Sequence, residues 1–161
     1  MRLLGVVFYL VWASTALAEE CQLDNDALRS MPKVEVSFTR ADQAPLTVQA
    51  KLADNYETRA AGFQRVCESV IAAEPILFVF QRERTPSFHM HNVVAPIEIA
   101  FIRKDGTIDV THLMQPYSLL MLNKPTYSSN GPVLAAIEMR PGFMQDNGIT
   151  PDSVMSWEKP K

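Results

Sequence analysis

The sequence lacks the features that mark a nucleic-acid-binding or membrane-spanning protein. Its 15 Lys and Arg residues are outnumbered by 18 Asp and Glu residues, which gives a formal net charge of −3 at pH 7. No basic stripe is present that could hold a phosphate backbone, so nucleic-acid binding is not expected. After residue 18, no apolar run approaches the roughly 20 residues that a helix needs to cross a bilayer, so the mature chain is expected to have no transmembrane segment.

The sequence also lacks the common catalytic motifs. It contains no Gly-x-Ser-x-Gly nucleophile elbow, no His-Glu-x-x-His zinc motif and no Cys-x-x-Cys redox pair. Acidic residues are plentiful, but nothing in the sequence pairs two of them across a cleft, as glycoside hydrolysis requires. An enzymatic activity therefore has no support from motifs.

The first eighteen residues have the pattern of a cleavable signal peptide. Arg2 supplies the positive charge, residues 3–12 form an apolar run, and Ala16-Leu17-Ala18 provides the small residues that signal peptidase requires. The apolar run is short for a membrane anchor, which is the alternative. We therefore expect cleavage between Ala18 and Glu19, which makes the mature protein periplasmic or secreted.

Only two cysteines are present, Cys21 and Cys67, and both lie in the expected mature chain. Exported proteins fold in an oxidising compartment, which favours a disulfide between them. In the chain-entropy model such a crosslink stabilises the fold by roughly 4 kcal/mol. The alternative is one buried cysteine and one free cysteine.

Apolar residues alternate with polar ones in several short segments, which is typical of half-buried strands. Val34, Val36 and Phe38 alternate in this way, and residues 46–52 follow the same pattern. Residues 76–80 form a continuous apolar run, as expected for a strand covered on both faces. Further strands are expected at residues 87–91, 97–103, 107–114, 133–139 and 153–157. This spacing predicts a mainly β fold, a single-domain β-sandwich or partly closed barrel with one or two short helices.

Turn and helix signals complete the predicted organisation. Gly106 can supply the positive φ of a tight hairpin, and a short helix is expected between a cap at Asp54, with Glu57 three residues later, and Gly62. A second helix is expected at residues 141–147. We predict a signal peptide at residues 1–18, a polar tether at 19–32 and one β-rich domain at 33–159.

Several short segments occur in an order that is typical of one family. The clearest is residues 87–102, which are similar to the pattern Phe-Trp-Met-Lys-Asn-Thr-x-x-Pro-Leu-Asp-x-x-Phe-Ile. Weaker matches occur at residues 58–65, 75–80, 105–108, 137–142 and 147–149. Through these motifs the chain resembles the domain of unknown function 192 family from about residue 33 to residue 157. The resemblance implies a compact, often exported β-sandwich, and it implies no particular reaction.

The departures from the family pattern draw attention to two histidines. His89 stands where the family has Trp, His91 where it has Lys, and Glu98 where it has Asp. Residues two apart on a strand project from the same face, so both imidazoles are expected to lie together. Imidazole is a common ligand of transition metals, and a third ligand would come from Glu98, His112 or a thioether. The alternative is that both histidines are ordinary exposed polar residues.

We carry forward three functional hypotheses. The first is a non-enzymatic binding module for a small ligand or an envelope partner, which uses the loop at 116–132 and the residues Phe88, His89, His91, Asn92 and Glu98. The second is a metal-dependent enzyme or metal-binding protein whose transition metal is held by His89, His91 and Glu98. The third is a structural protein that docks onto an envelope partner.

Overall fold

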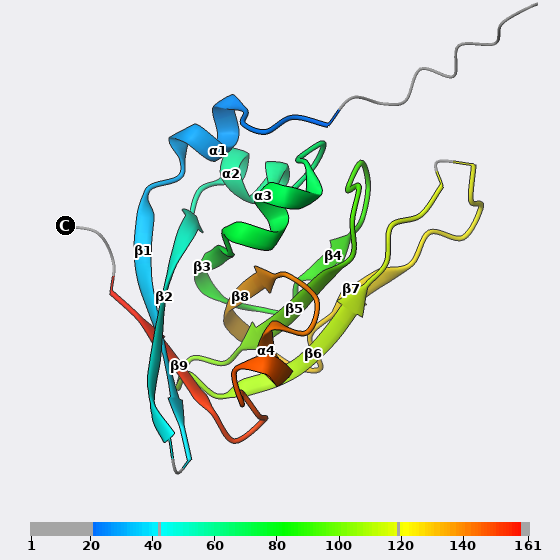
Figure 1. Ribbon diagram of the computed structural model, residues 1–161. Coiled ribbons are helices and arrows are strands. Elements are labelled where there is room, and N and C mark those ends of the chain that lie inside the picture. The colour runs from blue at the N-terminus through cyan, green and yellow to red at the C-terminus, as the bar shows by residue number, and fades with distance from the viewer. Residues whose placement is uncertain (1–20, 42, 119, 159–161) are drawn as a thin grey trace, which may run out of the picture.

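The computed structural model describes residues 21–158, with the exception of residues 42 and 119 (Figure 1). The expected signal peptide at residues 1–18 and its cleavage site at Glu19 lie outside the described residues. Within the described part of the chain, no helix combines the length and the apolar character needed to cross a membrane.

The chain folds mainly into β-strands, as the sequence predicted, and most of them form one seven-stranded sheet in the order β6-β5-β8-β3-β2-β1-β9. Its strands pair antiparallel, except that β2 and β3 run parallel. The strands of this sheet are β1 (Lys33–Arg40), β2 (Gln43–Ala53), β3 (Ile76–Arg84), β5 (Ile97–Ile102), β6 (Ile108–Met114), β8 (Val133–Met139) and β9 (Val154–Trp157). A separate two-stranded sheet pairs β4 (Ser87–His89) with β7 (Thr126–Ser128). The arrangement is sandwich-like, and the described strands form no closed barrel.

Two hydrophobic clusters cover the two faces of the large sheet. Successive residues of β3 alternate between them: Ile76, Phe78 and Phe80 belong to the first cluster, and Leu77 and Val79 to the second. This alternation explains the continuous apolar run at residues 76–80, because both faces of β3 are buried. The prediction of a strand covered on both faces is confirmed.

The hairpin between β5 and β6 turns at Gly106, as predicted. Its φ of +88° lies in the region that favours glycine. The position is also crowded, because a Cβ atom there would lie 2.5 Å from the backbone oxygen of Met155. The Met155 N–H donates to the Gly106 carbonyl at 2.9 Å, and Thr107 forms a bridge with Val154. The two edge strands of the sheet, β6 and β9, therefore approach each other at this turn.

Helix α2 (Tyr56–Ala61) begins one residue later than the sequence predicted. The cap is Asn55, whose side chain accepts from the Thr58 N–H at 2.9 Å, while the Thr58 hydroxyl faces the Asn55 N–H at 3.4 Å. The prediction of Asp54 as the cap is therefore wrong. Both residue types cap well, and Glu57 stands three residues after Asp54 as Thr58 does after Asn55, so local spacing does not distinguish the two positions. Gly62 ends the helix, as expected, but its φ of +47° and ψ of −135° do not form the left-handed helical conformation.

The segment expected as a tether packs onto the domain. It contains α1 (Asp26–Ser30), and Leu28 and Met31 are buried in the first cluster. A disulfide joins Cys21 to Cys67, as predicted, with their Cα atoms 4.8 Å apart. With α3 (Glu68–Ala73) and α4 (Phe143–Asp146), the described chain has four short helices, where one or two were expected. The two additional helices, α1 and α3, are short and flank the disulfide.

Candidate ligand-binding cavity

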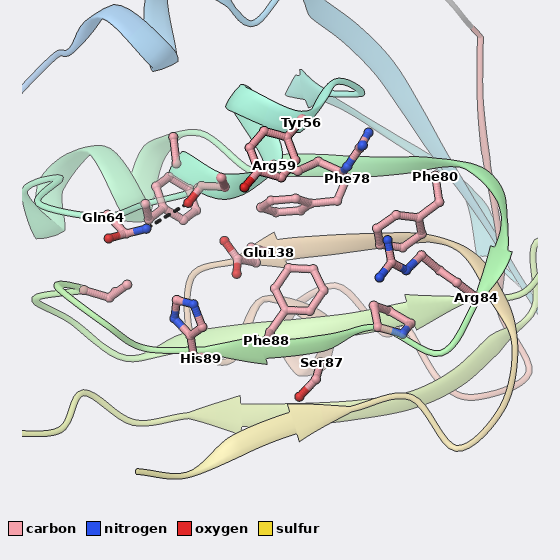
Figure 2. Close-up of a pocket in the computed structure, with 16 residues that line it drawn as sticks. Tyr56, Arg59, Gln64, Phe78, Phe80, Arg84, Ser87, Phe88, His89 and Glu138 are labelled. Atoms are coloured by element: carbon pink, nitrogen blue, oxygen red, sulfur yellow. Dashed lines mark hydrogen bonds between the residues drawn. The ribbon is translucent and has the colours of Figure 1, made fainter.

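A cavity of about 350 Å³ opens between α2 and the strands β3 and β4 (Figure 2). This volume is at the small end of the range of sites that bind small molecules. We call it the Glu138 cavity, after the one carboxylate residue among those that line it. Its floor is the large sheet, and its walls come from α2, from the turn after α2 and from β4.

Four phenylalanines are among the residues that line the cavity: Phe63, Phe78, Phe80 and Phe88. Phe78 and Phe88 meet edge to face with their ring centroids 5.1 Å apart. Phe88 also meets Phe101 edge to face, with ring centroids 5.6 Å apart. Among the described strands, β4 pairs with β7 alone, so it stands over the large sheet instead of extending it. Because β4 stands away from the large sheet, Phe88 is only half-buried. Space remains between β4, β3 and α2.

Glu138 lies in the middle of the sheet, where β8 is paired with β3 on one side and β5 on the other. Only 6% of its surface is exposed, and its Oε2 atom has no hydrogen-bond partner among the described residues. Figure 2 shows the carboxyl group pointing into the space between Phe78 and Phe88. Burial raises the pKa of Glu138 to about 8. At pH 7 the side chain is therefore mostly a neutral carboxylic acid, which can donate a hydrogen bond as well as accept one.

Gly62 keeps the wall opposite Glu138 open. A Cβ atom at Gly62 would lie 3.6 Å from the Phe78 ring and 3.9 Å from Oε2 of Glu138. A side chain longer than a methyl group would therefore extend toward the carboxyl group. The positive φ of Gly62 adds a second reason for glycine at this position.

Two arginines supply positive charge at one end of the cavity. The guanidinium groups of Arg59 and Arg84 lie 6.0 Å and 5.5 Å from the Phe80 ring centroid, and Arg59 also donates to the Val79 carbonyl at 3.1 Å. Within the described part of the chain, neither guanidinium forms a salt bridge with a carboxylate. Figure 2 shows Arg84 at one end of the cavity and His89 at the other.

The structure brings two of the predicted site residues, Phe88 and His89, to the cavity wall. The rings of His89 and His91 are neighbours, with centroids 6.2 Å apart, but β4 ends at His89 and His91 lies in the following turn. The backbone N–H of His91 faces Nδ1 of His89 at 3.3 Å. Asn92 has a φ of +56°, and its carbonyl accepts from the Arg65 N–H at 2.6 Å. Asn92 therefore shapes the turn.

Glu98 lies away from the two histidines. Its neighbours Ile97 and Ile99 belong to the first cluster, so Glu98 projects from the opposite face of the sheet. There its Oε2 atom accepts from the Met144 N–H at 3.1 Å, at the start of α4. The predicted grouping of His89, His91 and Glu98 is therefore not formed, and the described residues contain no group of three His, Cys, Asp or Glu residues placed to hold a metal ion.

His112, the other histidine considered as a ligand, has a structural role. Its Nε2 atom lies 3.0 Å from the Ser128 carbonyl, and its ring contacts Phe101 and Tyr127. These contacts tie β6 to β7 and help to hold the small sheet above the large one.

Sequence reasoning missed Glu138 as a site residue. The available signal was an acidic residue between Ile137 and Met139 in a segment expected to be a strand. An acid in such a position is either on a solvent-exposed face or a buried residue with a special role. The sequence alone does not reveal which, because the cover over that face comes from α2 and β4.

The chain has recognisable relatives. A family model described as DUF192, Uncharacterized ACR, matches residues 37–157. A crystal structure from Sinorhizobium meliloti, provisionally described as a transcription regulator, has a TM-score of 0.70 and 24% identity, and the match covers 80% of this chain and 95% of that chain. A protein of unknown function from Novosphingobium aromaticivorans has a TM-score of 0.68 and 21% identity, with coverage of 89% and 99%. Both likenesses show a shared fold. No curated protein matches the chain.

Proposed function

The chain belongs to the DUF192 family, and we propose that it is an exported binding module that holds a small ligand in the Glu138 cavity without changing it chemically. The N-terminal sequence supports export, because residues 1–18 have the pattern of a signal peptide. The disulfide between Cys21 and Cys67 suits an oxidising compartment. The observation that carries the binding proposal is the buried Oε2 atom of Glu138, which has no hydrogen-bond partner among the described residues and belongs to a cavity lined in part by phenylalanines.

An unpartnered polar atom in the interior is costly. Leaving a buried donor or acceptor without a hydrogen bond costs about 1–3 kcal/mol. An apolar residue would fill the same position in β8 without that cost. We infer that a ligand supplies the missing hydrogen bond to the carboxyl group of Glu138.

The surroundings of Glu138 define the chemistry of the ligand. The neutral acid donates its O–H, so the complementary group on the ligand is an oxygen acceptor such as a carbonyl or a carboxylate. The rings of Phe78 and Phe88 suit a flat, apolar body. Arg59 and Arg84 favour negative charge on the ligand. The best match is a small, partly apolar molecule that carries a carboxylate or carbonyl group.

A catalytic role is less well supported. A buried acid with a raised pKa also suits a general acid. However, glycoside hydrolysis uses two carboxyl groups, and Glu138 is the one acidic residue among those that line the cavity. The metal-dependent alternative depends on Glu98, which lies on the other face of the sheet. Binding is therefore the function that we propose.

Benzoate, a flat carboxylate, is the probe for the decisive test. Calorimetry on the mature protein should detect binding below pH 8, and the affinity should fall about tenfold for each pH unit above the pKa of Glu138, because the ionised carboxyl group repels the anion. Glu138→Gln keeps a neutral donor, so it should bind benzoate with no such pH dependence. Glu138→Leu should not bind.

The matched control is Glu35→Gln, because Glu35 lies on an exposed face of β1. This variant should bind benzoate as the wild type does, with the same dependence on pH. Equal binding by the wild type and Glu138→Leu would contradict the proposal that Glu138 holds the ligand.

A further inference from the structure

The loop between β6 and β7 projects from the body of the domain (Figure 1). Three consecutive apolar residues in the middle of this loop face solvent: Leu120 is 91% exposed, Met121 45% and Leu122 96%. We call these three residues the apolar tip. Single exposed apolar residues are common on protein surfaces, but a contiguous exposed group marks a surface that contacts something apolar.

The apolar tip is held in a defined turn. The Leu120 N–H donates to the Ser118 hydroxyl at 3.2 Å, and the Met121 N–H donates to the Ser118 carbonyl at 3.0 Å. The base of the loop is anchored to the domain, because Tyr117 packs against the first cluster and the Gln115 N–H donates to the Tyr127 hydroxyl at 3.1 Å. The anchored base and the turn direct the three side chains away from the core.

The charge around the apolar tip is suited to a lipid surface. Residues 110–137 contain no Asp or Glu, and the one charged residue of the loop at 115–125 is Lys124. The ammonium group of Lys124 lies 5.9 Å from the Tyr117 ring centroid. Tyrosine and lysine beside exposed leucines form the combination found where proteins meet the boundary between lipid headgroups and acyl chains.

We propose that the apolar tip inserts into the surface of a lipid bilayer, so that the protein binds reversibly to an envelope membrane. A protein partner fits less well, because a stable protein interface buries about 800 Å² on each side, and three side chains on a projecting loop provide far less. A bilayer needs no complementary shape and accepts a convex apolar tip. With so few apolar side chains and one basic residue, the binding is weak and favours anionic lipids.

Co-sedimentation of the mature protein with vesicles tests this proposal. The vesicles contain equal parts of phosphatidylcholine and phosphatidylglycerol. The wild type should pellet with the vesicles, and the double variant Leu120→Asp, Leu122→Asp should bind at least about tenfold more weakly, because it places two charges where apolar contact is needed. Lys124→Ala should lose about fivefold in binding to these vesicles and almost nothing on pure phosphatidylcholine.

The matched control is Leu23→Asp, which replaces another exposed leucine, 71% exposed, near the disulfide. It should bind vesicles as the wild type does. Thermal unfolding of each variant should be unchanged, because none of these side chains is buried. A tryptophan reporter, Leu122→Trp, should show a blue-shifted emission when vesicles are added.

Three results would overturn the proposal. They are a wild type that stays in the supernatant, a double variant that pellets as the wild type does, and a concentration-dependent dimer of the free protein that the same two substitutions abolish. The last result would identify a second copy of the chain as the occupant of the apolar tip. None of these measurements depends on the Glu138 cavity.

Discussion

Glu98 and Glu138 lie on neighbouring strands of one sheet, and their surroundings differ in almost every respect. On β5, the carboxylate of Glu98 points to the face of α4 and accepts a backbone hydrogen bond from Met144. On β8, the carboxyl group of Glu138 points to the opposite face, where it meets phenylalanines and has no described partner for Oε2. One glutamate completes a helix N-terminus, and the other is left with an unused hydrogen-bonding atom. Both faces bury a hydrophobic cluster, and the face of Glu138 also holds the candidate site.

The largest effect should distinguish the two faces by their packing. Phe38 is fully buried in the second cluster, and its ring centroid lies 6.5 Å from that of Phe143. Phe38→Ala should lower the free energy of unfolding by about 3–5 kcal/mol, whereas Phe88→Ala on the cavity side should lower it by about 1–2 kcal/mol, because Phe88 is half-buried beside existing space. Urea unfolding of both variants measures the difference. Equal losses would show that both faces are packed alike.

The next effect concerns the two glutamates and should have opposite signs. Glu138→Leu removes a buried carboxyl group whose Oε2 atom has no partner among the described residues, so it should stabilise the protein by about 1–3 kcal/mol. Glu98→Leu leaves the Met144 N–H without its acceptor, so it should destabilise the protein by about 1 kcal/mol. The same unfolding measurement applies. Destabilisation by Glu138→Leu would mean that Glu138 has a partner in solution.

Over a single pH unit, the smallest effect is the dependence of stability on pH. Because the pKa of Glu138 is raised to about 8 in the folded protein, the folded state holds a proton that the unfolded chain releases near pH 4.5. Stability should therefore decrease as the pH rises through this window, by at most about 1.4 kcal/mol per pH unit, and it should level off above 8. Glu138→Gln should remove this slope, and Glu98→Gln should leave it intact. Parallel curves for the wild type and Glu138→Gln would contradict the raised pKa.

The sequence predicted the strands well because their periodicity records which faces are buried. The apolar run of β3 and the turn at Gly106 both appear where they were expected. The helix cap was less predictable, because Asp54 and Asn55 are adjacent, both favour a helix cap, and each is followed three residues later by a side chain that can complete the contact.

The candidate site was predicted only in part. Phe88 and His89 were expected as site residues and line the cavity. The metal site with Glu98 is not formed, because Glu98 alternates with Ile97 and Ile99 along β5 and so projects from the opposite face of the sheet. Alternation along one strand reveals which residues share a face, but it does not relate that face to the face of a second strand. Glu138 required knowledge of what covers β8. That cover comes from segments far away in the sequence, so no local pattern contains it.

The pairing of β1 with β9 joins the first strand of the domain to the last, so that Phe38 lies opposite Met155. A nascent chain cannot complete this sheet until its C-terminal residues are available, and the bridge from Val154 to Thr107 forms only then. Contacts between such distant segments slow folding, because a long loop must close before they form. For a protein on the proposed export route, slow folding is an advantage, because a chain that has not yet folded can be threaded through a translocation pore. If the protein is exported as proposed, the topology of the sheet favours folding after delivery, when the disulfide can also form.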